Sequence, residues 1–412
     1  MDSLLLLMLA FVALEFCVSS VLSLLNQKWM SHPIPAQVAD IYDAESYSRQ
    51  QDYQRTNVSL ARVKRLAECV LTLALLASGA FGWFYGICAD LTCNQYLSAS
   101  YFFAAYVVLS DLIDLPFSYY SIFVIEEKFG FNKSTRGRFV ADWIKSLILS
   151  LVLTVALSCL ILYIYKCVGN SLWLWGTVAF SAIMVFMTLF YSNLIVPLFN
   201  KQTPLEKGEL RDAIAGAAAK VGFRIKNIYV IDGSKRSTKA NAYFTGFGAK
   251  KRIVLYDTLI DQLATDEIVA VLMHEIGHYR HHDIIKSLIG SIGQTAIFLY
   301  LFSLVLSLPS FSQALGYDAW SYPLSVLAFS LLLTPLDLVL SPVLNAMSRR
   351  NERGADSFAA TAGYGNSLAS ALKKLSAQSL SNLTPHPVFV WFNYSHPTVA
   401  ERVINVTDKI SR

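Results

Sequence analysis

The sequence has few charged residues and few cysteines for its length. Of its 412 residues, 15% are charged and 54% are hydrophobic, whereas roughly 25% are charged in an average soluble protein. A water-soluble fold could not bury that much apolar surface, and a disordered chain has the opposite balance. With 20 glycines, 12 prolines and 6 cysteines, a collagen-like protein and a disulfide-rich scaffold are also excluded. The composition predicts an integral membrane protein.

No cysteine follows Cys167. The hydrophilic segments beyond that point therefore have no thiol nucleophile and no thiolate metal ligand. Cys88 and Cys93 share one short loop, and a disulfide between them is left open by the sequence.

Seven apolar stretches are long enough to cross a bilayer as helices. A hydrocarbon core about 30 Å thick requires around 20 mostly apolar residues per helix. The candidates are residues 3–25, 66–87, 97–124, 146–166, 171–196, 287–308 and 322–347. The first lacks the basic start of a signal peptide, so we expect it to be retained. Pro335 and Pro342 should kink the last span.

Lys and Arg are concentrated in alternate loops. They are frequent at 26–65, 125–145, 197–286 and 348–412, and almost absent from the other connections. Because basic loops stay in the cytosol, the N-terminus is expected to be lumenal or outside. We expect a multi-pass protein of the endoplasmic reticulum, or of the bacterial inner membrane if the source is prokaryotic.

The chain is accordingly divided into four parts. Residues 1–196 carry the first five spans, with cytosolic loops at 26–65 and 125–145, and residues 287–347 carry the last two. Residues 197–286 form a cytosolic catalytic unit, and 348–412 a cytosolic C-terminal segment. The predicted fold is an α-helical polytopic membrane protein with seven transmembrane helices and a small α+β unit.

Residues 197–286 show the pattern of a small α+β unit. An amphipathic helix is expected at 205–222, followed by short strands at 227–232, 241–247 and 252–257. A further helix is expected from about 265 to 282, with acidic residues in its first turn and basic ones in its last, as the helix dipole favours.

That last helix contains the motif His274-Glu275-Ile276-Gly277-His278. Four residues at 100° each place the two imidazoles within about 40° of one another, so both can bind one metal ion. Glu275 lies beside them and can take a proton from water. The residues before the motif are apolar, which argues against the alternative of two incidental surface histidines.

Zinc bound in this way needs a third protein ligand and keeps one position open. Glu352 and Asp356 lie four residues apart on one face of a helix expected at 351–364. Glu352 can reach the metal, and Asp356 can accept the other N–H of a ligating imidazole. The alternative for this pair is an ordinary solvated acidic face. His281 is a rival ligand, although it falls at the end of its helix.

Residues 385–402 combine His386, His396 and Arg402 with several aromatic residues. Cationic groups of this kind can bind a substrate carboxylate or the charge that develops in a transition state. A packed aromatic tail with incidental histidines is the alternative that the pattern leaves open.

At these residues the sequence resembles the integral-membrane zinc CAAX prenyl proteases of type 1, the family that includes the yeast a-factor-converting enzyme. The resemblance extends over nearly the whole chain. The matching segments are Phe123–Lys133, Pro197–Leu205, Asn241–Phe247, Arg252–Leu259, His274–Tyr279, Glu352–Asp356 and Ser395–Arg402. The zinc motif alone would indicate only a zincin-type catalytic unit, but the combination is specific to this family.

The resemblance implies a role for each matching residue. His274, His278 and Glu352 would bind one Zn²⁺ per chain, with Glu275 as the general base and Asp356 as the partner of a ligating histidine. The substrates implied are prenylated CAAX proteins, from which the enzyme removes the C-terminal -aaX tripeptide. Membrane lipids are expected around it, and neither a nucleic acid nor an obligate protein partner is expected.

The resemblance also implies a substrate site. The segment Asn241, Ala242 and Tyr243 would bind the substrate main chain as an added edge strand. His396 and Arg402 would face the reacting peptide or its C-terminal carboxylate. Seven tilted helices are expected to enclose a chamber.

Two other functions fit parts of the sequence. A membrane quality-control zinc protease, acting on non-prenylated or misfolded membrane proteins, would have the same motif but usually fewer spans. A seven-helix receptor or transporter would suit the orientation. It would not explain a hydrophilic insertion of about 90 residues that carries a metal motif, because long loops are usually functional.

Overall fold

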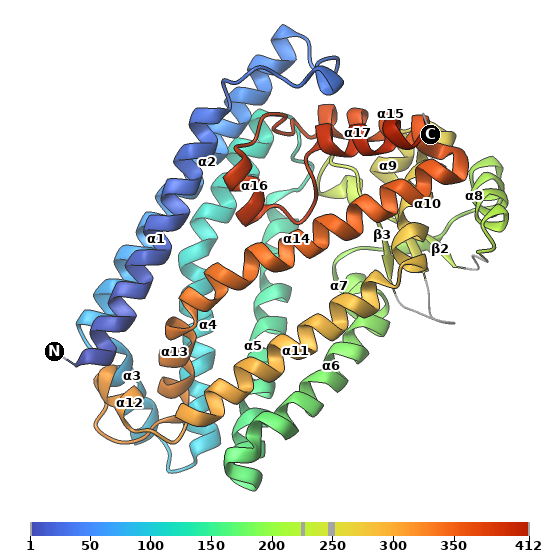
Figure 1. Cartoon of the computed structure of the whole chain (residues 1–412). Coiled ribbons are helices and arrows are strands. Elements are labelled where there is room, and N and C mark those ends of the chain that lie inside the picture. The colour runs from blue at the N-terminus through green and yellow to red at the C-terminus, as the bar shows by residue number, and fades with distance from the viewer. Residues whose placement is uncertain (1, 224–226, 246–251, 411–412) are drawn as a thin grey trace.

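The computed structural model of the protein describes residues 2–223, 227–245 and 252–410 (Figure 1). The helices are α1 (Ser3–Trp29), α2 (Ala44–Ala77), α3 (Ala80–Asp90), α4 (Gln95–Tyr120), α5 (Arg136–Val168), α6 (Leu172–Leu194), α7 (Val196–Phe199), α8 (Glu209–Lys220), α9 (Asp257–Gln262), α10 (Thr265–Arg280), α11 (Asp283–Val305), α12 (Ser310–Ala314), α13 (Tyr322–Leu332), α14 (Thr334–Ala359), α15 (Gly365–Gln378), α16 (Pro387–Asn393) and α17 (Val399–Ile410). The strands are β1 (Gln202–Pro204), β2 (Ile228–Ile231), β3 (Ala242–Thr245) and β4 (Arg252–Tyr256).

All seven predicted spans fall on helices. By length and apolar composition, the described residues contain four helical stretches able to cross a membrane, or six when each bent pair counts as one span. One of the four is the 64-residue stretch Arg136–Phe199. It contains both α5 and α6, between which the chain turns back (Figure 1). Gly169 lies in this turn with φ 55°. Counting α5 and α6 separately gives the seven predicted spans.

Two of the spans are bent. The second consists of α2 and α3, which meet at 65° across Gly79, a residue with φ 68° that suits glycine. The seventh consists of α13 and α14, which meet at 55°. Pro335 lies in the first turn of α14, so the predicted kink is present at this proline. Cys88 and Cys93 are both free thiols in this structure.

The hydrophilic insertion forms a four-stranded sheet in the order β1-β2-β4-β3. Strands β2 and β4 are parallel, whereas β1 and β3 pair antiparallel with their neighbours. The three predicted strands are present, although residues 246–247 of the second lie outside the part of the chain that the structure describes. Strand β1 was not predicted, and the helix expected from residue 205 begins at Glu209. Within the described residues β3 pairs only with β4, so its other edge is available to a further strand.

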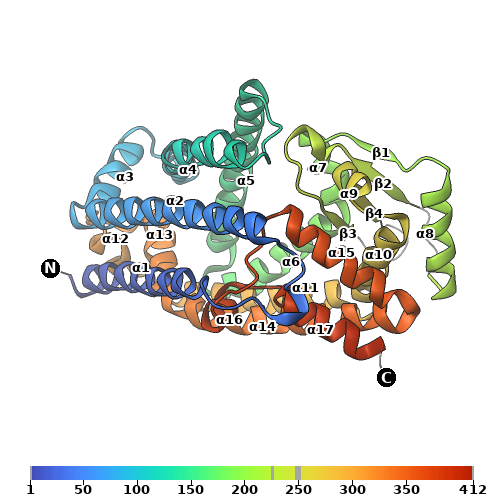
Figure 2. The ribbon, with the colours of Figure 1, turned by 90° about the horizontal axis from the view of Figure 1, so that it is seen from above.

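The sheet packs against helices that lie far apart in the sequence. Figures 1 and 2 show α8, α10 and α15 around it, together with the C-terminal α17. The shared core is made of buried aliphatic side chains, among them Ile214, Ile253, Leu255, Ile268, Leu272, Leu368 and Val406. This core fixes the position of α10, which carries the metal motif.

Helix α14 connects the last membrane span to this unit. Figure 1 shows it crossing the molecule from α13 to the neighbourhood of α10. The domain boundary expected between 347 and 348 falls inside this continuous helix. The helix expected at 351–364 is present, with its first nine residues continuing α14 and a π-helical segment, Ala360–Tyr364, following. One rigid element therefore extends from the membrane span to Glu352.

Candidate metal centre

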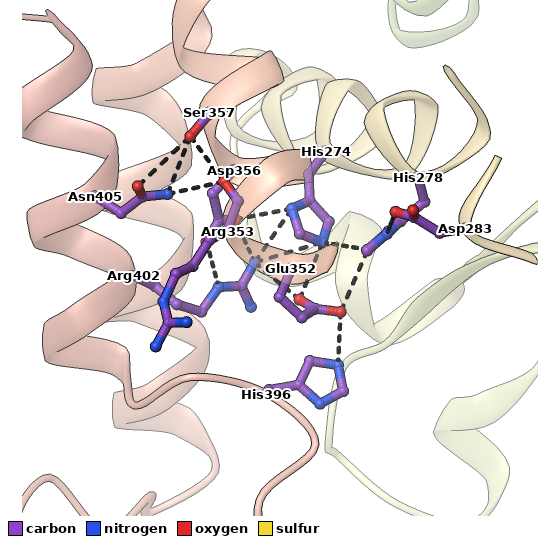
Figure 3. A network of polar contacts seen from close by, with 10 residues as sticks. All are labelled: His274, His278, Asp283, Glu352, Arg353, Asp356, Ser357, His396, Arg402 and Asn405. Atoms are coloured by element: carbon purple, nitrogen blue, oxygen red, sulfur yellow. Dashed lines mark hydrogen bonds and ion pairs between the residues drawn. The ribbon is translucent and has the colours of Figure 1, made fainter. Parts of the chain in front are cut away.

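His274 and His278 lie one turn apart on α10 and face each other (Figure 3). Their Nε2 atoms are 3.1 Å apart. The i, i+4 spacing predicted this proximity, because residues four apart lie on the same face of a helix.

Each imidazole is oriented by a carboxylate on its other nitrogen. His274 Nδ1 lies 2.8 Å from Asp356 Oδ1, and His278 Nδ1 lies 3.0 Å from Asp283 Oδ2. When a neutral imidazole donates its Nδ1–H to such a carboxylate, its Nε2 carries a lone pair. Two lone pairs then converge on the same space, which favours a cation between them.

Glu352 completes the group. Its Oε2 lies 3.4 Å from His274 Nε2, and its Oε1 lies 3.3 Å from His278 Nε2. Ligand atoms about 2.1 Å from a tetrahedral zinc are about 3.4 Å from one another, close to these spacings. Glu352 is only 6% exposed, and its Oε2 has no hydrogen-bond partner. A buried carboxylate oxygen without a partner is costly, so the donor set fits a metal ion.

The electrostatics of the group also favour positive charge. Burial and the charge of Arg402 lower the pKa of His274, but the adjacent carboxylates of Asp356 and Glu352 outweigh them and raise it to about 9. The carboxylates therefore attract a cation, a proton or a metal ion, to this position.

Glu275 adjoins the group but is not one of its ligands. It lines a cavity of about 640 Å³ together with His278 and Glu352. Burial raises the pKa of the Glu275 carboxyl group. A raised pKa brings a carboxylate nearer to the range in which it works as a general base at neutral pH.

Arg402 lies at the metal group, where its guanidinium meets Asp356. It makes a bidentate contact with Asp356, with Nε 2.9 Å from Oδ2 and Nη2 2.6 Å from Oδ1. Its Nη2 also lies 3.3 Å from His274 Nδ1. Because the guanidinium is occupied by Asp356, Arg402 is placed to position the carboxylate that orients His274.

His396 lies on the open side of the group. Its Nε2 is 3.3 Å from Glu352 Oε1, while its side chain is 61% exposed (Figure 3). Of the other predicted histidines, His386 contacts Trp29 (ring centroids 4.8 Å apart). The rival ligand His281 packs towards Phe358 and is not part of the metal group.

The segment expected to bind the substrate main chain overlaps strand β3. Asn241 is exposed just before it, and its Oδ1 accepts a hydrogen bond from Ala242 N at 2.8 Å. The Tyr243 hydroxyl lies 3.4 Å from Ser192 Oγ in α6. Strand β3 therefore contacts the membrane helix α6 through the side chain of Tyr243.

Sequence reasoning missed two residues at this site. Asp283 starts α11 and reaches back to His278 because the chain turns at His282, which has φ 57°. An acidic residue at a helix start shortly after the motif was the available signal. The other is Gly277, where α10 packs directly against α14. A Cβ at this position would lie 2.9 Å from Ala355 Cα.

Two family descriptions match the chain. "CAAX prenyl protease N-terminal, five membrane helices" matches residues 23–201, and "Peptidase family M48" matches residues 204–410. CAAX prenyl protease 1 of Saccharomyces cerevisiae is 35% identical over 92% of this chain and 89% of its own length. The chain belongs to the CAAX prenyl protease 1 family. It is a metallopeptidase and an integral membrane protein.

Other members of the family align over similar lengths. A homologue from Oryza sativa subsp. japonica is 33% identical, covering 98% of this chain and 97% of its own. The human homologue is 31% identical, with coverage of 90% and 88%. The crystal structure of Ste24p from S. mikatae superposes with a TM-score of 0.92 at 32% identity, covering 98% of this chain and 99% of that one. The predicted polytopic helical fold with its small α+β unit is thereby confirmed.

Proposed function

We propose that this metallopeptidase removes the C-terminal -aaX tripeptide from prenylated CAAX proteins, using one zinc ion bound by His274, His278 and Glu352. The observation that carries the proposal is the convergence of two imidazole Nε2 atoms and one buried, unpartnered carboxylate oxygen within a tetrahedral spacing. The names of the relatives, all CAAX prenyl proteases, support the substrate class.

A zinc ion held by His274, His278 and Glu352 would act as a Lewis acid on the scissile carbonyl and would lower the pKa of water towards about 7. Glu275 accepts a proton from the attacking water and transfers it to the departing amine. Glu275 is therefore a carboxylate again when the cycle ends. Asp356 and Asp283 hold the two imidazoles in orientation. Arg402 holds Asp356 and lies within 3.8 Å of Glu352.

The substrate main chain is assigned to the free edge of β3. An extended peptide can add to an exposed sheet edge through main-chain hydrogen bonds. Asn241, Ala242 and Tyr243, the residues to which the family resemblance gives this role, border that edge. His396, exposed beside Glu352, is placed to contact the reacting peptide from the opposite side.

We further propose that the catalytic unit lies on the cytosolic face of the endoplasmic reticulum membrane, with seven spans and a lumenal N-terminus. The distribution of Lys and Arg over the loops supports this orientation. A membrane location suits a prenylated substrate, because each buried CH₂ contributes about 0.8 kcal/mol to membrane association.

The test is hydrolysis of one CAAX peptide in farnesylated and unprenylated forms by the purified full-length protein. We expect release of -aaX from the farnesylated peptide, loss of that activity with o-phenanthroline and its return with zinc. Equal cleavage of both peptides would favour the quality-control protease instead. Farnesylated-peptide cleavage that survives removal of all metal would overturn the proposal.

A further inference from the structure

Two hollows of different chemistry lie near the metal group. The first, here called the membrane-side cavity, has a volume of about 640 Å³ and lies between α6, α11, α14 and the metal group. The second, here called the polar groove, has a volume of about 480 Å³ and extends from His396 to Lys239. His396 contacts Glu352, which lines the membrane-side cavity. A peptide cleaved at the metal therefore has one hollow on each side of the scissile bond.

The two hollows differ in charge. The membrane-side cavity contains the carboxyl groups of Glu275, Asp283 and Glu352, together with apolar side chains such as Met184 and Leu288. The polar groove is lined mainly by hydroxyl and amide side chains, and no acidic residue is among the described residues that line it. A free carboxylate would be repelled in the first hollow and accepted in the second.

Lys239 supplies the positive charge of the polar groove. Its Nζ donates to the Tyr53 hydroxyl at 2.8 Å and to Glu126 Oε2 at 2.8 Å, and the side chain remains 36% exposed. Burial lowers the pKa of Lys239, but its bonds to Glu126 and Tyr53 outweigh that effect and raise the pKa. The ammonium is therefore charged and held in a fixed place beside the groove by the Tyr53 hydroxyl and both carboxylate oxygens of Glu126.

Strand β3 lies between these two hollows. Its start follows Lys239 by three residues, whereas Phe244, near its end, lines the membrane-side cavity. At that same end the Thr245 hydroxyl donates to the Thr188 carbonyl oxygen of α6 at 3.5 Å. A peptide added to the edge of β3 thus has one end near Lys239 and the other near α6.

We propose that the substrate tail binds antiparallel to β3 and that Lys239 binds its C-terminal carboxylate in the polar groove. The prenylated cysteine then lies on the side of the membrane-side cavity, among Met184, Phe244 and Leu288. Three residues separate the scissile carbonyl from the chain end, a reach of about 10 Å in extended form. This assignment rests on the proposed function, and it makes Lys239 a specificity-determining residue for a free chain end.

The experiment measures binding of a farnesylated CAAX peptide to the zinc-loaded Glu275→Gln protein, with the peptide ending in a carboxylate or in a carboxamide. We expect the carboxylate form to bind roughly tenfold to a hundredfold more tightly, as for a charge-assisted hydrogen bond. In Lys239→Met this ratio should fall to about one, and in Lys239→Arg it should persist. The matched control is Lys373→Met, which breaks a comparable ion pair to Asp40 outside the groove and should leave the ratio unchanged.

If the Lys239–Glu126 contact were purely structural, its loss in Lys239→Met would weaken the binding of both peptides equally, and the ratio of their affinities would not change. The inference is overturned if Lys239→Met keeps the preference for the carboxylate peptide. It is also overturned if the Glu275→Gln protein with Lys239 intact binds the two peptides equally tightly. Failure of the proposed function would be seen in a different measurement. The wild-type protein would then not hydrolyse the farnesylated peptide, whatever the ratio of the two peptide affinities.

Discussion

Gly277 of α10 lies directly against the backbone of Ala355 in α14. A Cβ at Gly277 would be 2.9 Å from Ala355 Cα and 3.1 Å from its carbonyl oxygen. Gly277 precedes the ligand His278, and Ala355 follows Glu352 by three residues. The absence of a side chain at this one position therefore allows the two helices to approach closely enough for three ligands to share one metal ion.

Replacing Gly277 by alanine should separate these helices. We expect a loss of about 1–3 kcal/mol of stability, the usual cost of overpacking, and a lower zinc affinity. Thermal unfolding and zinc titration of the detergent-purified protein measure the two effects. Gly216→Ala in α8 is the matched control, since nothing lies within 4 Å of its Cβ position, and it should keep zinc affinity unchanged. Normal zinc binding in Gly277→Ala would refute the role assigned to this contact.

Glu275→Gln should abolish hydrolysis while keeping the metal. Removing a general base typically costs 10²–10⁴-fold in rate, and Glu275 is not one of the three grouped ligands. Peptide hydrolysis and zinc stoichiometry, measured on the same sample, check both halves. Wild-type turnover in this variant would remove Glu275 from the mechanism.

Asp283→Asn tests a residue that the motif itself did not reveal. Its carboxylate orients His278 from 3.0 Å, and loss of such a partner typically weakens metal binding 10- to 100-fold. Competition with a zinc chelator measures the change. Lys286 pairs with the other oxygen of Asp283 at 3.1 Å, so Lys286→Met is the control, and its zinc affinity should be near that of the wild type.

The pH dependence of stability should differ between metal-free and zinc-loaded protein. Burial and Arg402 lower the pKa of His274, but Asp356 and Glu352 raise it from 6.5 to about 9. In the metal-free protein, the proton on His274 therefore stabilises the fold fully below pH 6.5, and this contribution is lost as pH rises through about 9. Zinc competes with that proton. The gap in Tm between the two forms should widen from pH 6.5 to 9, and a constant or narrowing gap would contradict the account.

The part of the site that the sequence predicts is local. The spacing of His274 and His278 specifies one helix face, and the apolar residues before them indicate a buried helix. Glu352 lies 74 residues beyond His278, so its distance from the histidines depends on how α14 packs, and the residues alone left a solvated face open. Only the family resemblance assigned it as a ligand.

Tertiary packing accounts for what the sequence reasoning missed. Strand β1 has three residues and ends at Pro204, too short for a periodic signal. The continuity of α14 across residue 347 was not evident from the sequence, because the chain stays helical where it leaves the apolar region. The pairing of Arg402 with Asp356 joins residues 46 positions apart, so the sequence alone did not reveal it.

Anomalous diffraction at the zinc absorption edge, from crystals of the full-length protein purified without added chelator, tests the central claim most directly. We predict one strong peak at bonding distance from Nε2 of His274, Nε2 of His278 and the carboxylate of Glu352. The absence of a peak in enzymatically active crystals, or a peak on other residues, would contradict the account.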